Sequence, residues 1–265
     1  MDSPYLTEKH LSDCVYLLST RGYCLIEEFL ESAHCLLLKG KLIEALASYR
    51  EFAGSKRSVL DRHQLHDLLC REFDFAKLIE DPRIQQLLEA FLGPYWIMYA
   101  FTSSSIPPNG TNYSARIHVD SPRWVAGYPF NMGVIWTLDE YTVDNGALEV
   151  LPGSHHNERA PDEELFSKNS VRITCPAGSA IVFDARLFHR TGENKSDQFR
   201  HALTMNACRP YMKQRMDWVR FVPERISSAL SARGRRVLGF DTRLPENLDE
   251  FFVPDNERLY KAGQG

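Results

Sequence analysis

The sequence has no long apolar run and no excess of basic residues. The leucine run at 36–38 is interrupted at once by Lys39 and Lys41, whereas a helix needs about 20 apolar residues to cross a bilayer. The formal net charge of the 265 residues is −4, so the chain offers no strong positive field to a nucleic acid. We therefore expect neither a membrane nor a nucleic-acid partner.

Paired cysteines and a secretion signal are also missing. The six cysteines form no Cys-x-x-Cys pair, which excludes the usual ligand spacing of structural zinc sites. The opening residues lack the basic start and apolar core of a signal peptide. We therefore expect reduced thiols, no disulfides and a cytoplasmic location.

The first hundred residues show the apolar periodicity of helices. One helix is expected to begin after Thr7, a second to span 32–52, and a third to begin at Asp81-Pro82, where an N-cap residue is followed by proline. Helical character is expected again over 213–238. This C-terminal segment either caps the core or meets a partner subunit, and the oligomeric state is undetermined.

From Tyr95 onward, short runs rich in β-branched and aromatic residues alternate with turn residues. Strands are predicted near 95–103, 114–119, 130–138, 147–150, 171–174, 179–184 and 200–208. Helices first and strands afterwards predict a mainly β member of the α+β class, with helices packed on a β-sandwich or jelly roll. No repeat or linker divides the chain, so residues 1–265 are predicted to form a single domain.

His118 and Asp120 stand two residues apart in the predicted strand 114–119 and just beyond it. Side chains at positions i and i+2 of an extended segment point to the same side. An imidazole and a carboxylate that converge in this way supply two thirds of a 2-His-1-carboxylate metal site, which keeps coordination positions open. The pair therefore predicts a metal centre, provided that a third ligand exists.

His189 is the best candidate for the third ligand, because it follows an apolar strand and would reach the rim of the β-structure, where pockets form. His155 and His156 follow a Pro-Gly turn and are interpreted as loop residues near the site. His201 neighbours Arg200 on a strand, so the two side chains point to opposite faces.

Arg200 stands eleven residues after His189. The turn between them would place the two residues on adjacent antiparallel strands. A guanidinium there offers a fork of donors to a carboxylate, and Thr191 can add a hydroxyl donor. The alternative is an Arg on the surface of a strand.

Together, His118-Val119-Asp120, the segment 145–155 (NGALEVLPGSH) and the spacing of His189 and Arg200 resemble the phytanoyl-CoA dioxygenase family of Fe(II)- and 2-oxoglutarate-dependent oxygenases. The resemblance covers nearly the whole chain. It implies a double-stranded β-helix, the jelly roll of the cupins, with N-terminal and C-terminal helices packed on one sheet.

The resemblance also implies the cofactors. Iron would be held by His118, Asp120 and His189, and 2-oxoglutarate would chelate the iron while Arg200 and Thr191 bind its distal carboxylate. Dioxygen would be the second cosubstrate, and succinate and CO2 would be released.

Three further positions bear on the resemblance. Trp136 matches a tryptophan that lines the cosubstrate pocket in some relatives, and plain core packing is the alternative. Val119 stands where many relatives carry Gln, which removes a polar contact from that position. Related halogenases carry a small residue where this chain has Asp120, so the resemblance implies hydroxylation of a C–H bond.

The substrate is the least constrained feature. Arg116 should face the same side as the metal pair, and Trp124 and Asn112 lie on flanking loops. They are candidate contacts for a small polar molecule or natural-product intermediate, with ordinary loop packing as the alternative. A jelly-roll protein that binds metal without 2-oxoglutarate, either a cupin-like isomerase or a sensing module, remains the competing hypothesis.

Overall fold

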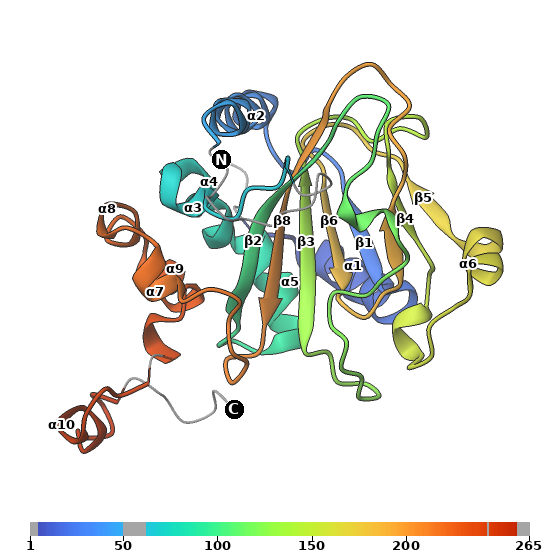
Figure 1. The fold of residues 1–265 in the computed structure, drawn as a ribbon. Helices are drawn as coiled ribbons and strands as arrows, with labels where there is room; N and C mark the ends of the chain where they lie inside the picture. The colour runs from blue at the N-terminus through green and yellow to red at the C-terminus, as the bar shows by residue number, and fades with distance from the viewer. Residues whose placement is uncertain (1–4, 50–61, 243, 259–265) are drawn as a thin grey trace.

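Two antiparallel sheets face each other in the computed structural model, which describes residues 5–49, 62–242 and 244–258 (Figure 1). The large sheet has the order β1-β6-β3-β8-β2 and the small sheet the order β5-β4-β7. Their bounds are β1 Tyr23–Ile26, β2 Ile97–Ile106, β3 Asn131–Thr137, β4 Leu148–Val150, β5 Val171–Ile173, β6 Ala180–Asp184, β7 His189–Thr191 and β8 Arg200–Cys208. This is the predicted α+β jelly roll.

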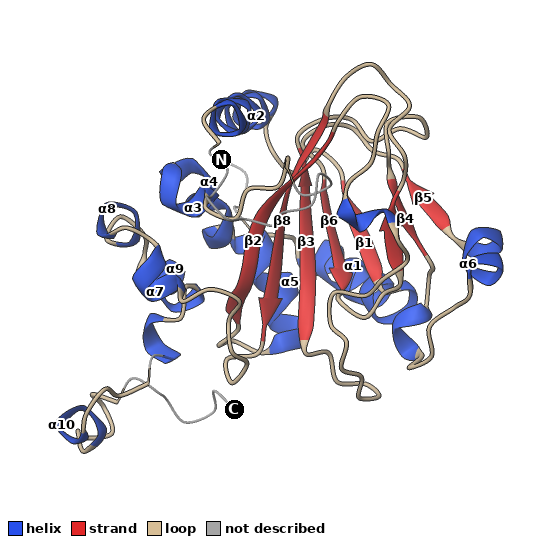
Figure 2. Cartoon of the chain, in the orientation of Figure 1, coloured by secondary structure: helices blue, strands red, loops and turns tan. Residues whose placement is uncertain are grey.

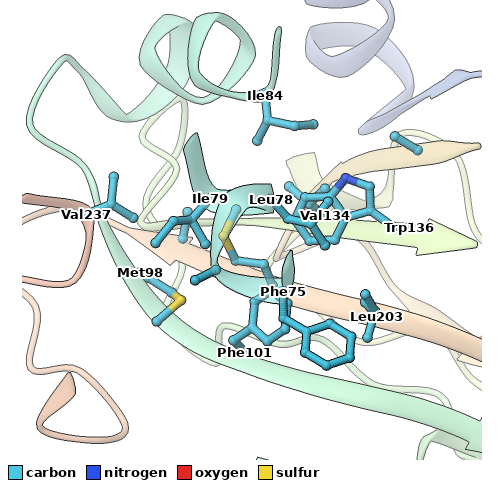
Figure 3. Close-up of a cluster of buried hydrophobic side chains, with 14 of the residues drawn as sticks. Phe75, Leu78, Ile79, Ile84, Met98, Phe101, Val134, Trp136, Leu203 and Val237 are labelled. Atoms are coloured by element: carbon cyan, nitrogen blue, oxygen red, sulfur yellow. The ribbon is translucent and has the colours of Figure 1, made fainter. Parts of the chain in front are cut away.

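The strands of the large sheet are buried on both faces. In β3, Ile135 joins Ile181 and Leu148 in a core between the two sheets, whereas Trp136 points the other way into a larger core beneath the helices (Figure 3). The two-residue alternation of a strand produces this division. It also decides which β3 side chains can reach a site between the sheets.

The N-terminal helices cover the outer face of the large sheet (Figure 2). The helix α1 contacts β1 and β6, and α5 contacts β3. The bounds are α1 Glu8–Arg21, α2 Ser32–Ala47, α3 Leu68–Arg71, α4 Phe73–Lys77, α5 Pro82–Leu92, α6 Glu163–Asn169, α7 Trp218–Phe221, α8 Glu224–Ser227, α9 Ala232–Val237 and α10 Leu248–Phe251. Four 3-10 turns complete the described elements: η2 Leu78–Glu80, η3 Tyr113–Ala115, η4 Ser154–His156 and η5 Phe240–Thr242.

The predicted helix starts are confirmed. Thr7 caps α1 by accepting from the His10 N–H, and Asp81 caps α5 by accepting from the Arg83 N–H. The helix predicted over 32–52 ends at Ala47, and residues 50–52 lie outside the described residues. No helix in the part of the chain that the structure describes is both long enough and apolar enough to cross a membrane.

One predicted element is wrong. The segment 114–119 is not a strand: Asn112 caps the short turn η3, and only His118 then forms a bridge, with His189. The helical character predicted over 213–238 is confirmed, and it is divided into three short helices with the N-cap residues Asp217, Pro223 and Ser231. A proline inside a helix removes a hydrogen bond and clashes with the preceding turn. The three short helices pack beside the β2 edge of the large sheet (Figure 1).

Candidate metal centre and anion pocket

His118, Asp120 and His189 converge at one end of the two sheets. One ligand atom from each lies within 4.8 Å of the other two. His118 Nε2 is 3.7 Å and His189 Nε2 is 4.0 Å from the same Asp120 oxygen, Oδ1. Two imidazoles and one carboxylate on one side of an ion leave the opposite positions free, which fits Fe(II) in an oxygenase.

Both imidazoles are oriented by the main chain. His118 Nδ1 lies 2.8 Å from the Arg116 carbonyl oxygen, and His189 Nδ1 lies 2.9 Å from the Leu187 carbonyl oxygen. Each Nδ1 therefore carries the proton and each Nε2 presents its lone pair to the centre of the group. Burial and the neighbouring His189 ring lower the pKa of His118 to about 4, so this imidazole is neutral and able to ligate at physiological pH.

The local backbone explains how the His-x-Asp segment reaches this position. His118 and His189 exchange two N–H···O=C bonds of 3.0 Å. The N–H groups of Asp120 and Ser121 then both donate to the Ala185 carbonyl. These bonds hold the segment against the end of β6 and the start of β7, although it makes no continuous strand.

A chain of side-chain amides holds the carboxylate. Asn206 donates to Asp120 Oδ2 at 3.3 Å, and Asn131 donates to Asn206 Oδ1 at 3.0 Å. Oδ2 is thereby occupied by a donor, which leaves Oδ1 for an ion. Such outer partners of a ligand fix its orientation and tune its affinity for metal.

A cavity of about 140 Å³ opens from this centre into the space between the sheets. His118 and Asp120 line it at one end, and Arg200 and Thr191 also line it. The other lining residues are Gln64, Tyr99, Ala100, Thr102, Ser104, Tyr113, Ser114, Val134, Ile135, Tyr141, Leu148, Phe183, Thr204, Met205, Asn206 and Arg215. The structure therefore brings two of the predicted metal ligands, His118 and Asp120, and the predicted anion-binding residues to one cavity.

Arg200 is a buried cation, 2% exposed. It donates from Nη1 to the Tyr141 hydroxyl and from Nη2 to the Gly146 carbonyl at 3.3 Å, and its Nε finds no partner among the described residues. Burial lowers the pKa of its guanidinium. A buried charge is costly unless it is paired, and the described residues pair it with no carboxylate. The arrangement suits an anionic ligand.

Tyr141 is a part of this pocket that the sequence did not indicate. The guanidinium carbon of Arg200 lies 4.3 Å from the centre of the Tyr141 ring. Burial raises the pKa of the Tyr141 phenol to about 12. The hydroxyl thus keeps its proton and, while it accepts from Arg200, can donate to a bound anion. Tyr141 follows β3 on a loop held by its bridge to Cys175, a long-range contact that has no local signature.

The segment 145–155 shapes both ends of the site. Asn145 ties the turn by accepting from the Thr142 N–H, and Gly146, at φ +84°, presents its carbonyl to Arg200. A Cβ at Gly146 would lie 2.8 Å from the Gly192 carbonyl oxygen, so a side chain is excluded there. Ser154 accepts from the Phe188 N–H at 2.9 Å and so fixes the approach to His189.

Trp136 does not lie in the pocket. It is fully buried and packs in the helix-side core, with its ring 6.1 Å from that of Phe101 (Figure 3). Its neighbour Ile135 lines the cavity instead. The core-packing alternative therefore describes Trp136, because strand alternation turns it away from the space between the sheets.

The three predicted substrate residues also lie outside the cavity lining. Arg116 is exposed, since the missing strand removes the alternation that would have aligned it with His118. Trp124 donates to the His155 carbonyl at 3.3 Å. Asn112 is buried, donates to Ser104 Oγ and caps η3. They support neighbouring loops, and Tyr113 and Ser114 of η3 line the cavity in place of Asn112.

Two cavity-lining residues that were not predicted, Thr204 and Asn206, could have been found from the sequence. With Arg200 facing the pocket, Thr204 and Asn206 share its face of β8 by two-residue alternation, and both line the cavity. His155 and His156, by contrast, turn toward the Ser19 carbonyl at the end of α1 and away from the metal centre.

Gly133 makes room for a ring that supports His189. A Cβ at Gly133 would lie 2.2 Å from the Phe183 ring, and that ring packs edge-on against His189 with centroids 5.2 Å apart. Gly133→Ala is therefore expected to lower the free energy of unfolding by about 1–3 kcal/mol through overpacking and to weaken Fe(II) binding. Urea unfolding and anaerobic Fe(II) titration measure the two effects.

The control for this substitution is Gly40→Ala. A Cβ at Gly40 in α2 meets nothing within 4 Å, so alanine there should stabilise the helix by roughly 0.5–1 kcal/mol. Adding Phe183→Leu to the Gly133→Ala protein should restore part of the lost stability. An alanine at 133 that left both stability and metal affinity unchanged would contradict the expected clash.

Comparison with known proteins agrees with this fold. The family described as phytanoyl-CoA dioxygenase (PhyH) matches residues 18–202. The chain belongs to this family of dioxygenases. It is 30% identical over 255 residues to an uncharacterized protein of Mycobacterium tuberculosis, Rv1501, covering 94% of this chain and 93% of that protein. It is 24% identical over 200 residues to the dioxygenase andF of Emericella variicolor, covering 72% and 66% of the two chains.

Solved structures share the fold. EctD from S. alaskensis, crystallised with 2-oxoglutarate and 5-hydroxyectoine, superposes with a TM-score of 0.64 at 20% identity over 78% of this chain and 77% of that chain. The α-ketoglutarate-dependent epimerase SnoN of nogalamycin biosynthesis gives a TM-score of 0.61 at 18% identity over 76% and 83%. At these identities the similarity establishes the jelly roll alone.

Proposed function

We propose that this dioxygenase binds Fe(II) and 2-oxoglutarate and hydroxylates an unactivated C–H bond of a small polar or natural-product-type molecule. One observation carries the cofactor assignment. His118 and Asp120 of the His-Asp-His group line the same cavity as Arg200, a buried cation that lacks a carboxylate partner among the described residues. A metal site kept for structure alone would have no use for that cation.

We assign the site residues to two roles, metal binding and cosubstrate binding. His118, Asp120 and His189 would hold the iron, while Arg200, Tyr141 and Thr191 would receive the distal carboxylate of 2-oxoglutarate. When bound, iron and 2-oxoglutarate supply the oxidising chemistry, in which one oxygen atom of O2 enters the substrate and the other enters succinate as CO2 leaves. The protein positions the C–H bond and keeps bulk water from the oxidant.

The competing hypothesis is a jelly-roll protein that works without 2-oxoglutarate. It leaves the buried guanidinium of Arg200 unexplained, and we do not favour it. The experiment that separates the two is an anaerobic titration of the folded protein with Fe(II) and then 2-oxoglutarate.

A weak visible charge-transfer band is expected when 2-oxoglutarate is added to the Fe(II)-loaded protein. Absence of the band in well-folded, Fe(II)-loaded protein would overturn the cofactor assignment. Once a substrate is found, its product should gain the mass of one oxygen atom with one succinate formed per turnover. An isomerised product of unchanged mass would show that the enzyme epimerises its substrate and does not hydroxylate it.

A further inference from the structure

The chain after β8 turns back beside β2 (Figure 1). The pairing of β2 with β8 shifts register between Met98 and Ala100, so Tyr99 is an extra, bulged residue. Its carbonyl accepts from the Arg215 N–H at 3.1 Å and from Trp218 Nε1 at 3.3 Å. Bulges of this kind redirect side chains and interrupt strand pairing. Here the bulge docks the C-terminal segment on the wall of the site.

A second anchor lies next to the first. Gln214 Nε2 donates to the Met98 carbonyl at 2.7 Å and to the Leu238 carbonyl at 3.2 Å. The segment before α7 is therefore held from both sides of Arg215. Arg215 and Tyr99 both line the cavity that contains His118 and Asp120.

The charges of the cavity lining show what Arg215 offers. The formally charged side chains of the cavity lining are Asp120, Arg200 and Arg215. In the loaded site of the proposed function, the two carboxylates of 2-oxoglutarate and Asp120 balance Fe(II) and Arg200. The guanidinium of Arg215, which is exposed and forms no ion pair within the described ranges, is then the cation left without a counter-ion.

We propose that Arg215 binds an anionic group of the substrate, so that the substrate class is small molecules bearing a carboxylate or similar anion. This inference rests on the proposed function and assigns the substrate side of the same cavity. Tyr99 and Tyr113 are on the same lining. An Arg fork that receives a carboxylate gives both charge and orientation.

The position of Arg215 in the chain agrees with a role in specificity. The family match ends at residue 202, so the shared region supplies the metal ligands and Arg200, and Arg215 lies beyond it. We thus assign to Arg215 the substrate contact that the sequence predicted for Arg116, although Arg215 lies far from the His-x-Asp pair in the sequence.

The test uses small carboxylic acids, each paired with its own primary amide. Each compound is added to anaerobic protein loaded with Fe(II) and 2-oxoglutarate, and the change in the visible band is recorded; succinate release is then measured in air. The acids are expected to perturb the band and to stimulate succinate release, and their amides are not. Phosphonate analogues of the active acids distinguish a general anion site from a carboxylate-specific one.

Two variants sharpen the result. Arg215→Gln should raise the apparent KM of active acids roughly tenfold, the low end of the value for charged hydrogen bonds because the residue is exposed, with a smaller change in kcat. Arg220→Gln is the matched control, since Arg220 is exposed on α7, pairs with Glu246 and does not line the cavity. Arg215→Lys should recover part of the loss.

Each outcome is decisive. A panel in which no acid perturbs the band, or in which amides act as well as acids, overturns the assignment of Arg215, as does an unchanged KM in Arg215→Gln. Failure of the proposed function appears differently, because the visible band would then be missing from the wild-type protein before any acid is added.

Discussion

Replacing Asp120 with alanine is expected to weaken Fe(II) binding by more than about 100-fold and to abolish substrate-dependent succinate release. Loss of an outer partner of a metal ligand already costs about 10- to 100-fold, and Asp120 is the only carboxylate in the His-Asp-His group. Anaerobic titration with Fe(II) alone measures the affinity. Without the carboxylate, two imidazoles face the ion and its charge is no longer reduced by a ligand.

Asp197→Ala provides the control for this substitution, because Asp197 is exposed and does not line the cavity. Its metal affinity should equal that of the wild type. Far-UV circular dichroism establishes that both variants fold. Undiminished hydroxylation by the Asp120→Ala protein would refute the assignment of the three metal ligands.

Replacing Arg200 with methionine is expected to weaken 2-oxoglutarate binding by about 2–5 kcal/mol, a factor of roughly 30 to several thousand. The buried Arg200 lines the cavity and brings a positive charge to it, and methionine supplies no charge. Titration of the visible band with 2-oxoglutarate gives the affinity directly. Fe(II) binding in the absence of 2-oxoglutarate should be retained.

Thermal unfolding gives an independent measure of the same change. 2-Oxoglutarate should raise the Tm of the Fe(II)-loaded wild type, since a ligand that binds only the folded state stabilises it, and this shift should vanish in Arg200→Met. The variant without ligand should lose little stability, because a buried unpaired charge contributes little to folding. Arg159→Met, at an exposed site, should behave as wild type. An unchanged affinity for 2-oxoglutarate would mean that another group anchors it.

The metal group could be predicted from the sequence because its signals are local. His118 and Asp120 are separated by one residue, and His189 follows an apolar strand. Even so, the reason for the convergence of the pair differs from the prediction. The segment is held by the exchanged bonds with His189 and by the two N–H groups that donate to Ala185, rather than by a regular strand.

The substrate side could not be predicted in the same way. Arg116 was assigned to the site by strand alternation, and that alternation fails once the segment forms η3. Trp136 was assigned by resemblance, but its face of β3 is set by which side the helices cover. Tyr99 and Arg215 meet only because a bulge in β2 binds the segment before α7.

The sequence by itself determined the class of fold, the helix starts, the three candidate ligands and the cation for the anion pocket, because caps, apolar periodicity and short motifs act over a few residues. The tertiary structure decided which side chains face the cavity. Tyr141 joins Arg200 through a loop bridge to Cys175, and Arg215 arrives from a segment beyond β8. Contacts between residues far apart in the chain depend on strand register, bulges and packing, which no local pattern encodes.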